Sequence, residues 1–210
     1  MTTADKPLLY HASPSRSSTI LWMLEEVGQP YDMELLDLKA GDNLKPAFLA
    51  INPMGKVPAL SHRGEIVTEV PAICAYLADA YPQAGLAPAF NSPKRAPYLR
   101  WLMFSTASFE PAVISKAMKW EGGQRAMLGY GDFDSTMNTA AVAIATGPWL
   151  LGGTFSAADV ALGAQIRWTM QFKMIPEKAE FLAYVARLNA RPALQRANAK
   201  DAALAKSTSA

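Results

Sequence analysis

The stretch 52–77, N-P-M-G-K-V-P-A-L-S-H-R-G-E-I-V-T-E-V-P-A-I-C-A-Y-L, constrains the fold most, because prolines and glycines divide it into short apolar runs. Pro58 lies inside the apolar run 57–60, yet a proline cannot donate the backbone N–H that a central strand requires. It must therefore lie at the start or the edge of a strand, and a cis bond before it is one of the expected conformations.

A hairpin and a helix are predicted around and after Pro58. A turn at Gly64 joins the run 57–60 to a second strand at 66–67, which predicts an antiparallel hairpin. After the acidic Glu69, apolar residues recur at positions 73, 76, 77 and 80, the spacing of a helix with one buried face. This layout leaves an exposed backbone edge beside an acidic helix start, which suits a peptide-like ligand.

The preceding residues predict two strands joined by a helix. Residues 8–11 form a short strand, and the serine-rich turn after it offers several helix caps, with Pro14 at the first helical position. Apolar residues at 20, 23, 24 and 27 predict a helix that Gly28 ends, and 31–38 is a second strand. With a short polar helix before the hairpin, the order is βαβαββα, and the right-handed crossover implies parallel pairing of the first two strands.

Beyond residue 82 the strand signal disappears and helical patterns dominate. Prolines and glycines between 81 and 93 mark a linker. We therefore expect an α/β domain at 1–82, a linker at 83–93 and an all-helical domain at 94–210.

Three features of the helical part carry specific expectations. Pro111 is expected to bend a long helix at 97–120. Ser156 and Asp159 form a capping box that opens a later helix. Residues 201–210 are expected to be a frayed tail.

Composition and charge restrict the kind of partner. Of the 210 residues 50% are hydrophobic and 18% are charged, enough for a large core, and the formal net charge is +2. No run of lysine and arginine marks a nucleic-acid or anionic-membrane surface, and no apolar window is long enough to span a bilayer. Cys74 is the single cysteine and can form no internal disulfide, while His11 and His62 show no metal-like spacing. We expect a soluble cytoplasmic protein without a metal site.

Four motifs together resemble the cytosolic glutathione S-transferase family over almost the whole chain. They are L-Y-H-A-S-P-S-R-S-S with L-W-M-L-E-E-V-G, then N-P-M-G-K-V-P-A-L, T-E-V-P-A-I-C-A-Y-L, and F-S-A-A-D-V-A-L. The resemblance implies an α/β thioredoxin-like N-terminal domain, an all-α C-terminal helical bundle and a homodimer. It also implies a detoxification enzyme of the bacterial, serine-activated type, which transfers glutathione to a small hydrophobic electrophile.

Such a transfer needs the glutathione thiolate, although a free thiol has a pKa of about 8.5. Lowering this pKa by about 1.5 to 2 requires roughly 2–3 kcal/mol of preferential thiolate stabilisation, which one hydroxyl donor at a helix N-terminus can supply. The resemblance implies a Tyr, Ser or Cys near the first turn, where this chain has no cysteine. Ser15 is the first candidate, followed by Ser13, Ser17 and the weaker Tyr10; the alternative is that these serines only cap the helix.

The resemblance also implies how the glutathione peptide is held. Val57 would offer its backbone N–H and C=O to the cysteinyl part in the manner of an added strand, with Pro58 in cis. Glu69 would bind the γ-glutamyl amine, and the N–H of Val70 would bind the γ-glutamyl carboxylate at the helix start. The alternatives are a plain strand-edge proline and a first-turn acid favoured by the helix dipole.

Two basic residues are candidates for the remaining charges of the ligand. Lys56 could reach the glycyl carboxylate. Arg16 could hold a substrate carboxylate, or it could pair with Glu25 or Glu26 on the surface.

Val70 departs from the family pattern, which has a serine at this position. The backbone N–H remains, and the missing hydroxyl bond is worth about 0.5–1.5 kcal/mol. Some family members that act on aryl ethers carry an aliphatic residue here, so glutathione-dependent ether cleavage or dehalogenation is one alternative to conjugation. A non-catalytic glutathione-binding or protein-interaction module of the same fold is another.

Aromatic and methionine side chains at helical spacing are expected to form either the helical core or an apolar substrate pocket. They are Tyr98, Trp101, Phe104, Phe109, Met118, Trp120, Met170 and Phe172.

Overall fold

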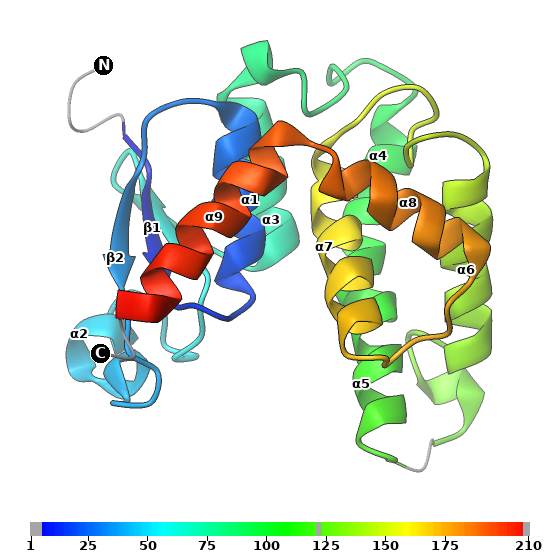
Figure 1. Ribbon diagram of the computed structural model, residues 1–210, viewed down its shortest axis with the longest axis horizontal. Helices are drawn as coiled ribbons and strands as arrows, with labels where there is room; N and C mark the ends of the chain where they lie inside the picture. The colour runs from blue at the N-terminus through cyan, green and yellow to red at the C-terminus, as the bar shows by residue number, and fades with distance from the viewer. Residues whose placement is uncertain (1–5, 121–122, 208–210) are drawn as a thin grey trace. The chain divides into compact units, whose positions relative to one another are not determined.

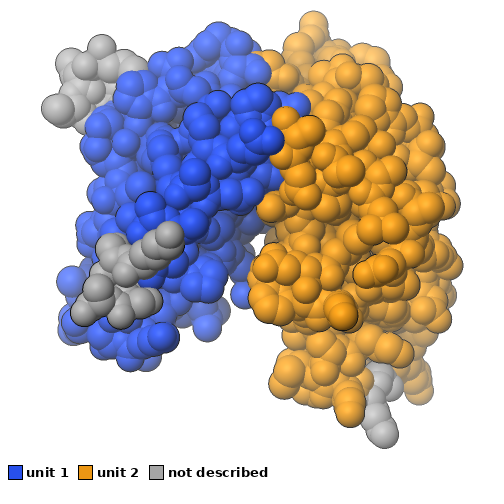
Figure 2. All heavy atoms as spheres, in the orientation of Figure 1, with its two compact units in different colours: residues 1–84, 191–210 blue, residues 85–190 orange. Residues whose placement is uncertain are grey.

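The computed structural model describes residues 6–120 and 123–207, and the chain divides into two compact units. Figure 2 colours the first unit, formed by the segments 1–84 and 191–210, and the second unit, residues 85–190. The expected domains at 1–82 and 94–210 and the linker at 83–93 remain a prediction. The C-terminal segment is grouped with the first unit.

The first unit is built on a four-stranded sheet of order β2-β1-β3-β4. Its strands are β1 (Leu8–His11), β2 (Asp32–Leu35), β3 (Ala59–His62) and β4 (Glu65–Thr68). β1 runs parallel to β2 and antiparallel to β3, and β3 runs antiparallel to β4. The predicted parallel pair and the predicted hairpin are both confirmed.

Helices pack against this sheet and against one another. The helical elements of the unit are α1 (Ser17–Val27), η2 (Asp42–Leu44), α2 (Pro46–Leu49), α3 (Val70–Ala80), η3 (Pro82–Ala84) and α9 (Pro192–Ser207). α1 contacts β1, α3 and α9, and Figure 1 shows α9 lying along α1. Gly28 ends α1 as predicted, with a φ of 70° and its N–H bonded to the carbonyl of Leu24. Pro14 is not the first helical residue, because α1 begins at Ser17.

The core of the first unit consists of the apolar residues that the sequence periodicity marks. Leu9, Ile20, Leu24, Leu60, Ile73 and Leu77 are each at most 1% exposed. Burying a side chain of this size contributes about 1.5–3 kcal/mol. Cys74 is fully buried beside them, and burial raises the pKa of its thiol, so it is a core residue and not a nucleophile.

α9 corrects the expectation of a frayed tail, which is wrong for residues 201–207. Its residues Ala193, Leu194 and Ala197 are buried. Three cations of the same segment bind acids of α1: Arg191 Nε lies 2.6 Å from Glu26 Oε1, Arg196 Nε 2.7 Å from Glu25 Oε2, and Lys200 Nζ 2.6 Å from Glu25 Oε1. Apolar burial and ion pairing together hold α9 on the first unit.

The second unit is helical. Its elements are α4 (Arg95–Phe104), the π-helical segment η4 (Ser105–Phe109), α5 (Glu110–Ala117), η5 (Arg125–Met127), α6 (Phe133–Ala145), α7 (Ala157–Gln171) and α8 (Ala179–Asn189). η4 interrupts the predicted long helix just before Pro111, which has no N–H for the preceding turn. Ser156 and Asp159 form the predicted capping box at the start of α7. Within the described parts of the chain, no helix has the length and hydropathy needed to cross a bilayer.

Candidate functional site

Three segments of the first unit meet at one end of its sheet. Tyr10 lies opposite Ala59, and Ala59 lies opposite Thr68. The residues that follow β1, precede β3 and follow β4 therefore leave the sheet at the same end. These residues are the serine-rich turn, the Val57–Pro58 pair and Glu69, so the fold brings together positions far apart in the sequence.

The Val57–Pro58 peptide bond is cis, as the sequence allowed. Pro58 is buried and Val57 is half-buried, while Lys56 is exposed. The buried Asn52 orders the preceding turn, because its Nδ2 donates to the carbonyl of Lys56 at 2.7 Å and its Oδ1 accepts the N–H of Met54 at 3.1 Å. The backbone of Val57 is thus held at the beginning of β3.

Glu69 combines an exposed side chain with an unusual backbone conformation. Its φ is 66° and its ψ is 122°, a combination that residues with a side chain rarely adopt and that costs about 1–3 kcal/mol. Glu69 caps α3, since its carbonyl accepts the N–H of Ile73 at 2.9 Å. Val70 is the buried first residue of the helix, so its N–H belongs to the positive helix end. Strain of this kind points to a functional position.

The serine turn contains the three predicted hydroxyls in different surroundings. Ser15 is half-exposed, and its Oγ lies 2.7 Å from Ser17 Oγ and accepts the N–H of Ser17 at 3.0 Å. Ser17 is fully buried. Ser13 donates its hydroxyl to the backbone carbonyl of Asp201 at 3.3 Å, and its bond to Pro14 is cis.

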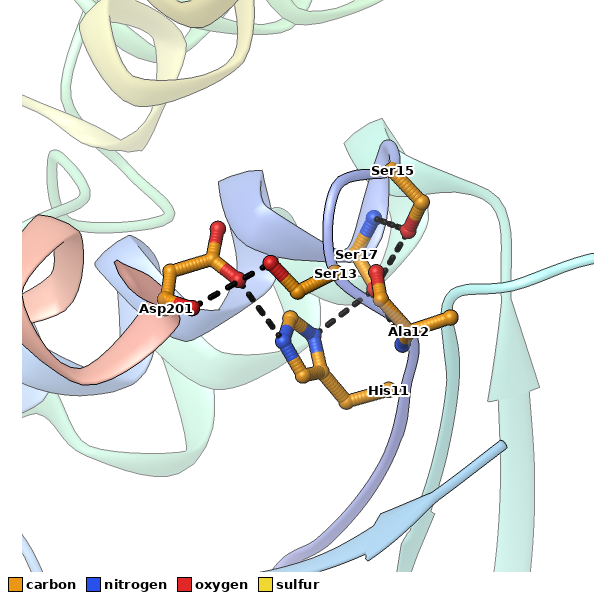
Figure 3. Close-up of polar contacts among 6 residues, drawn as sticks. All are labelled: His11, Ala12, Ser13, Ser15, Ser17 and Asp201. Atoms are coloured by element: carbon orange, nitrogen blue, oxygen red, sulfur yellow. Dashed lines mark hydrogen bonds and ion pairs between the residues drawn. The ribbon is translucent and has the colours of Figure 1, made fainter. Parts of the chain in front are cut away.

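His11 and Asp201 extend the serine pair into the interior (Figure 3). His11 Nδ1 lies 2.8 Å from Ser17 Oγ, and its Nε2 lies 3.1 Å from Asp201 Oδ1. The His11 side chain is fully buried, and that of Asp201 is 18% exposed. Burial raises the pKa of Asp201, but hydrogen bonds from His11, Ser13 and Ser18 outweigh burial and lower it below its ordinary value. Asp201 is therefore a carboxylate at neutral pH.

Tyr10 lies on the other face of the sheet from these groups, because neighbouring strand residues point to opposite faces. Its ring packs edge-on against Phe48 of α2 with centroids 5.7 Å apart. The side chain is 8% exposed, and burial together with Glu34 raises the pKa of the phenol. Tyr10 thus belongs to a small core cluster with Phe48 and Ala59.

Arg16, the last candidate, is exposed and directly precedes α1. Glu25 and Glu26, its alternative partners, bind Arg196 and Lys200 of α9 and Arg191 just before it.

Sequence reasoning missed His11 and Asp201 as members of the site. The spacing argument treats His11 only as a potential metal ligand, and the expectation of a frayed tail at 201–210 includes Asp201. A signal for Asp201 exists in the helical spacing, because it lies four residues after the buried Ala197 and three before Leu204. An acidic residue on an otherwise apolar stripe indicates a buried polar partner.

The site can bind a peptide-like ligand and stabilise an anion. It offers a strand edge at Val57, a carboxylate at Glu69, the N-terminus of α3, and a half-exposed hydroxyl at the N-terminus of α1. No three or more His, Cys, Asp or Glu side chains of the described residues are grouped so that they could hold a metal ion.

Comparisons with known proteins agree on one family. The model of the glutathione S-transferase N-terminal domain matches residues 15–80. The crystal structure of a glutathione transferase from Methylococcus capsulatus is 30% identical, with a TM-score of 0.77 over 93% of this chain and 98% of that one. A sphingomonad glutathione S-transferase complexed with glutathione is 27% identical, with a TM-score of 0.74 over 93% and 98%. Glutathione S-transferase 3 of Schizosaccharomyces pombe is 32% identical over 106 residues, which is 50% of this chain but only 43% of that relative.

Proposed function

Because the chain belongs to the glutathione S-transferase family, and is thus an enzyme with glutathione as co-substrate, we propose that it conjugates the glutathione thiolate to a small hydrophobic electrophile. The observation that carries the proposal is the common end of the sheet where the serine turn, the cis bond before Pro58 and Glu69 meet. A binding module would need the strand edge and the acid, but it would not need a hydroxyl at the helix N-terminus.

The peptide part of glutathione is proposed to bind as an added strand. The N–H and C=O of Val57 would pair with the cysteinyl backbone next to the cis-Pro58. The carboxylate of Glu69 would take the γ-glutamyl amine, and the N–H of Val70 would take the γ-glutamyl carboxylate. Lys56 and Arg16 are both exposed, and they are the candidates for the glycyl carboxylate.

Ser15 is proposed to donate its hydroxyl to the thiolate. It is the serine whose side chain is partly open to solvent and bonded to no backbone carbonyl in the contacts described above, whereas Ser17 is fully buried and Ser13 bonds α9. A hydrogen bond to a charged acceptor is worth about 1.5–3 kcal/mol, and the N-terminus of α1 adds about 0.3–1 kcal/mol. Together these terms cover the cost of forming the thiolate at neutral pH.

Replacing Ser15 tests this assignment. Ser15→Ala should raise the pKa of the bound thiol by about 1–2, because it removes a charge-assisted hydrogen bond. Conjugation of chlorodinitrobenzene at neutral pH should then fall about 10- to 100-fold, with glutathione affinity nearly unchanged. Ser13→Ala is the matched variant and should lose less activity, since Ser13 donates to the backbone of Asp201. An Ser15→Ala enzyme with undiminished conjugation would show that another group binds the thiolate.

The hydrophobic character of the electrophile is proposed from the second unit taken by itself. Of the marked aromatic and methionine side chains, Tyr98, Trp101 and Phe109 are buried and form core, and Phe104 and Met170 are half-buried. The remaining ones, Met118, Trp120 and Phe172, are 58–62% exposed. For an apolar electrophile to bind there, these side chains would have to form one contiguous exposed patch. Mass analysis of the products from several electrophile classes would separate conjugation from ether cleavage and dehalogenation.

The homodimer implied by the resemblance is proposed as well. One chain has a mass of 22.7 kDa. Light scattering in solution should give twice this value.

A further inference from the structure

The distances along the hydrogen-bonded chain Ser15–Ser17–His11–Asp201 favour one set of proton positions in the free protein. Asp201 is a carboxylate and only accepts, so His11 Nε2, 3.1 Å away, must carry a proton. In a neutral imidazole Nδ1 is then an acceptor. The 2.8 Å contact to Nδ1 therefore contains the hydroxyl proton of Ser17.

The orientation of Ser15 follows from that of Ser17. Because Ser17 gives its proton to His11, the 2.7 Å contact between the two hydroxyls must contain the proton of Ser15. Ser17 Oγ also accepts the N–H of Ala12 at 3.1 Å, and the carbonyl of Ala12, 3.2 Å away, is a more distant acceptor for the Ser17 proton than His11 Nδ1. In this state the hydroxyl proton of Ser15 points inward and cannot reach a thiolate outside.

Adding one proton to His11 reverses the chain. An imidazolium donates from both nitrogens, so Nδ1 donates to Ser17. Ser17 then donates to Ser15 at 2.7 Å, a shorter contact than the 3.2 Å to the carbonyl of Ala12, and the hydroxyl proton of Ser15 becomes available to the outside. The carboxylate of Asp201 stabilises the imidazolium through Nε2. The arrangement is that of a serine, histidine and aspartate relay with one additional hydroxyl.

We propose that His11, held by Asp201, receives the thiol proton of glutathione through Ser15 and Ser17. The inference rests on the proposed function, in which Ser15 binds the sulfur. The S–H bond breaks as an O–H bond forms at Ser15; the former proton of Ser15 passes to Ser17, and that of Ser17 passes to His11 Nδ1. The products are a thiolate hydrogen-bonded by Ser15 and an imidazolium paired with Asp201.

The relay explains why a buried histidine and the C-terminal helix take part in the site. His11 and Asp201 touch no substrate atom and act through the serines, so they are positioning residues. After the thiolate attacks the electrophile, the proton returns by the same route to the leaving group or to water. The protein gains one positive charge and glutathione one negative charge, so the total charge of their complex stays constant while the thiolate forms.

Proton counting distinguishes the relay from a simple hydrogen bond. Glutathione binding is measured by calorimetry in buffers of different ionisation enthalpy, and thiolate formation is measured by ultraviolet absorbance. S-methylglutathione, which has no thiol proton, supplies the baseline. The relay predicts that the wild-type protein forms thiolate while releasing almost no proton to the buffer, whereas a simple hydrogen bond predicts one proton for each thiolate.

Two variants and one control complete the test. His11→Asn removes the proton acceptor but leaves an amide donor for Ser17, so the thiolate should require a pH higher by about 1 or more, and its proton should appear in the buffer. Asp201→Asn should shift the thiolate titration in the same direction. This variant replaces His11→Asn in the test if His11→Asn does not fold. His62→Asn is the matched control, because His62 is an equally buried histidine bound to the hydroxyls of Tyr76 and Tyr81. It should change neither the titration nor the proton count.

Each outcome distinguishes the relay from a simple hydrogen bond or from a protein that does not activate glutathione. Wild-type thiolate with one released proton overturns the relay and leaves Ser15 as a simple donor. Absence of thiolate in the wild-type protein overturns the proposed function, and the relay with it. An equal shift in His62→Asn would also overturn the relay, since the effect would then follow from any loss of a buried imidazole.

Discussion

Glu69 holds a backbone conformation that costs free energy for any residue with a side chain. Its φ of 66° lies in the positive range that glycine, which has no Cβ, adopts more readily than other residues. We expect Glu69→Gly to stabilise the first unit by about 1 kcal/mol, the strain released less the added chain entropy of glycine in the unfolded state. Glutathione affinity should fall in the same variant, because the carboxylate for the γ-glutamyl amine is lost.

Glu69→Ala separates the two effects of that substitution. Alanine removes the carboxylate but keeps the strained conformation, so glutathione affinity should fall equally without any gain in stability. Thermal unfolding and glutathione titration of both variants are the measurements. If Glu69→Gly is no more stable than Glu69→Ala, the conformation of Glu69 is not strained.

Residues of the site differ in how far the sequence can predict them. Val57, Pro58, Glu69 and Val70 lie in one local stretch, where proline, an acid and helical periodicity identify their places. His11 and Asp201 are 190 positions apart, and their contact depends on the folding of α9 onto α1. The helical spacing can mark Asp201 as an acid with a buried partner, but no local pattern identifies His11 as that partner.

At the scale of elements, the pairing of α1 with α9 centres on a nearly buried acid. Glu25 is bound by Arg196, Lys200 and the hydroxyl of Tyr31, at 2.6 to 2.7 Å. Burial raises the pKa of Glu25, but the bonds from Lys200, Tyr31 and Arg196 outweigh burial, and the net pKa is lowered. Burial and the bond to Glu25 in turn raise the pKa of Tyr31 to about 12.

This lowered pKa predicts an acid-sensitive helix pair. A carboxyl with a depressed pKa in the folded state adds stability above its unfolded pKa, about 4.3, and loses it as the pH falls through the folded value. The thermal midpoint of the wild-type protein should therefore exceed that of Glu25→Gln at neutral pH, and the difference should shrink below about pH 4. A difference that stays constant over this range would mean that Glu25 acts through packing and not through its charge.

The predictions of secondary structure are wrong where tertiary contacts or local changes of hydrogen bonding determine the helix. The strands and the helices α1 and α3 follow from apolar periodicity with clear turn residues, and their places are confirmed. α9 carries few large apolar residues, so its sequence resembles a solvated tail, and its helix is held by burial of Leu194 and by ion pairs with α1. The helix predicted at 97–120 contains the π-helical segment η4, a local change of hydrogen bonding that periodicity does not reveal.

At the scale of the whole molecule, the first unit is assembled from two segments separated by more than a hundred residues of the second unit. Residues 1–84 supply the sheet and residues 191–210 supply its last helix. Residues 85–190 are therefore synthesised before α9, and the proposed relay to Asp201 exists only once the C-terminal segment has docked. The residues proposed to bind glutathione, in contrast, all lie in the first segment.

This division predicts that a fragment of residues 1–84 will be destabilised and that a peptide of residues 191–207 will restore it. Without α9, Glu25 loses two cations, α1 loses its packing against α9, and the buried Leu194 is missing. Replacing the buried Leu194 by alanine in the peptide should cost about 2–5 kcal/mol, an affinity loss of about 30-fold or more. Replacing Arg196 by glutamine removes its ion pair with Glu25. Because the arginine side chain is 53% exposed, this loss should cost less, about 1 kcal/mol. The thermal midpoint of the fragment, titrated with each peptide, measures these losses; an equal or larger loss for the arginine variant would show that charge, and not apolar burial, holds α9 in place.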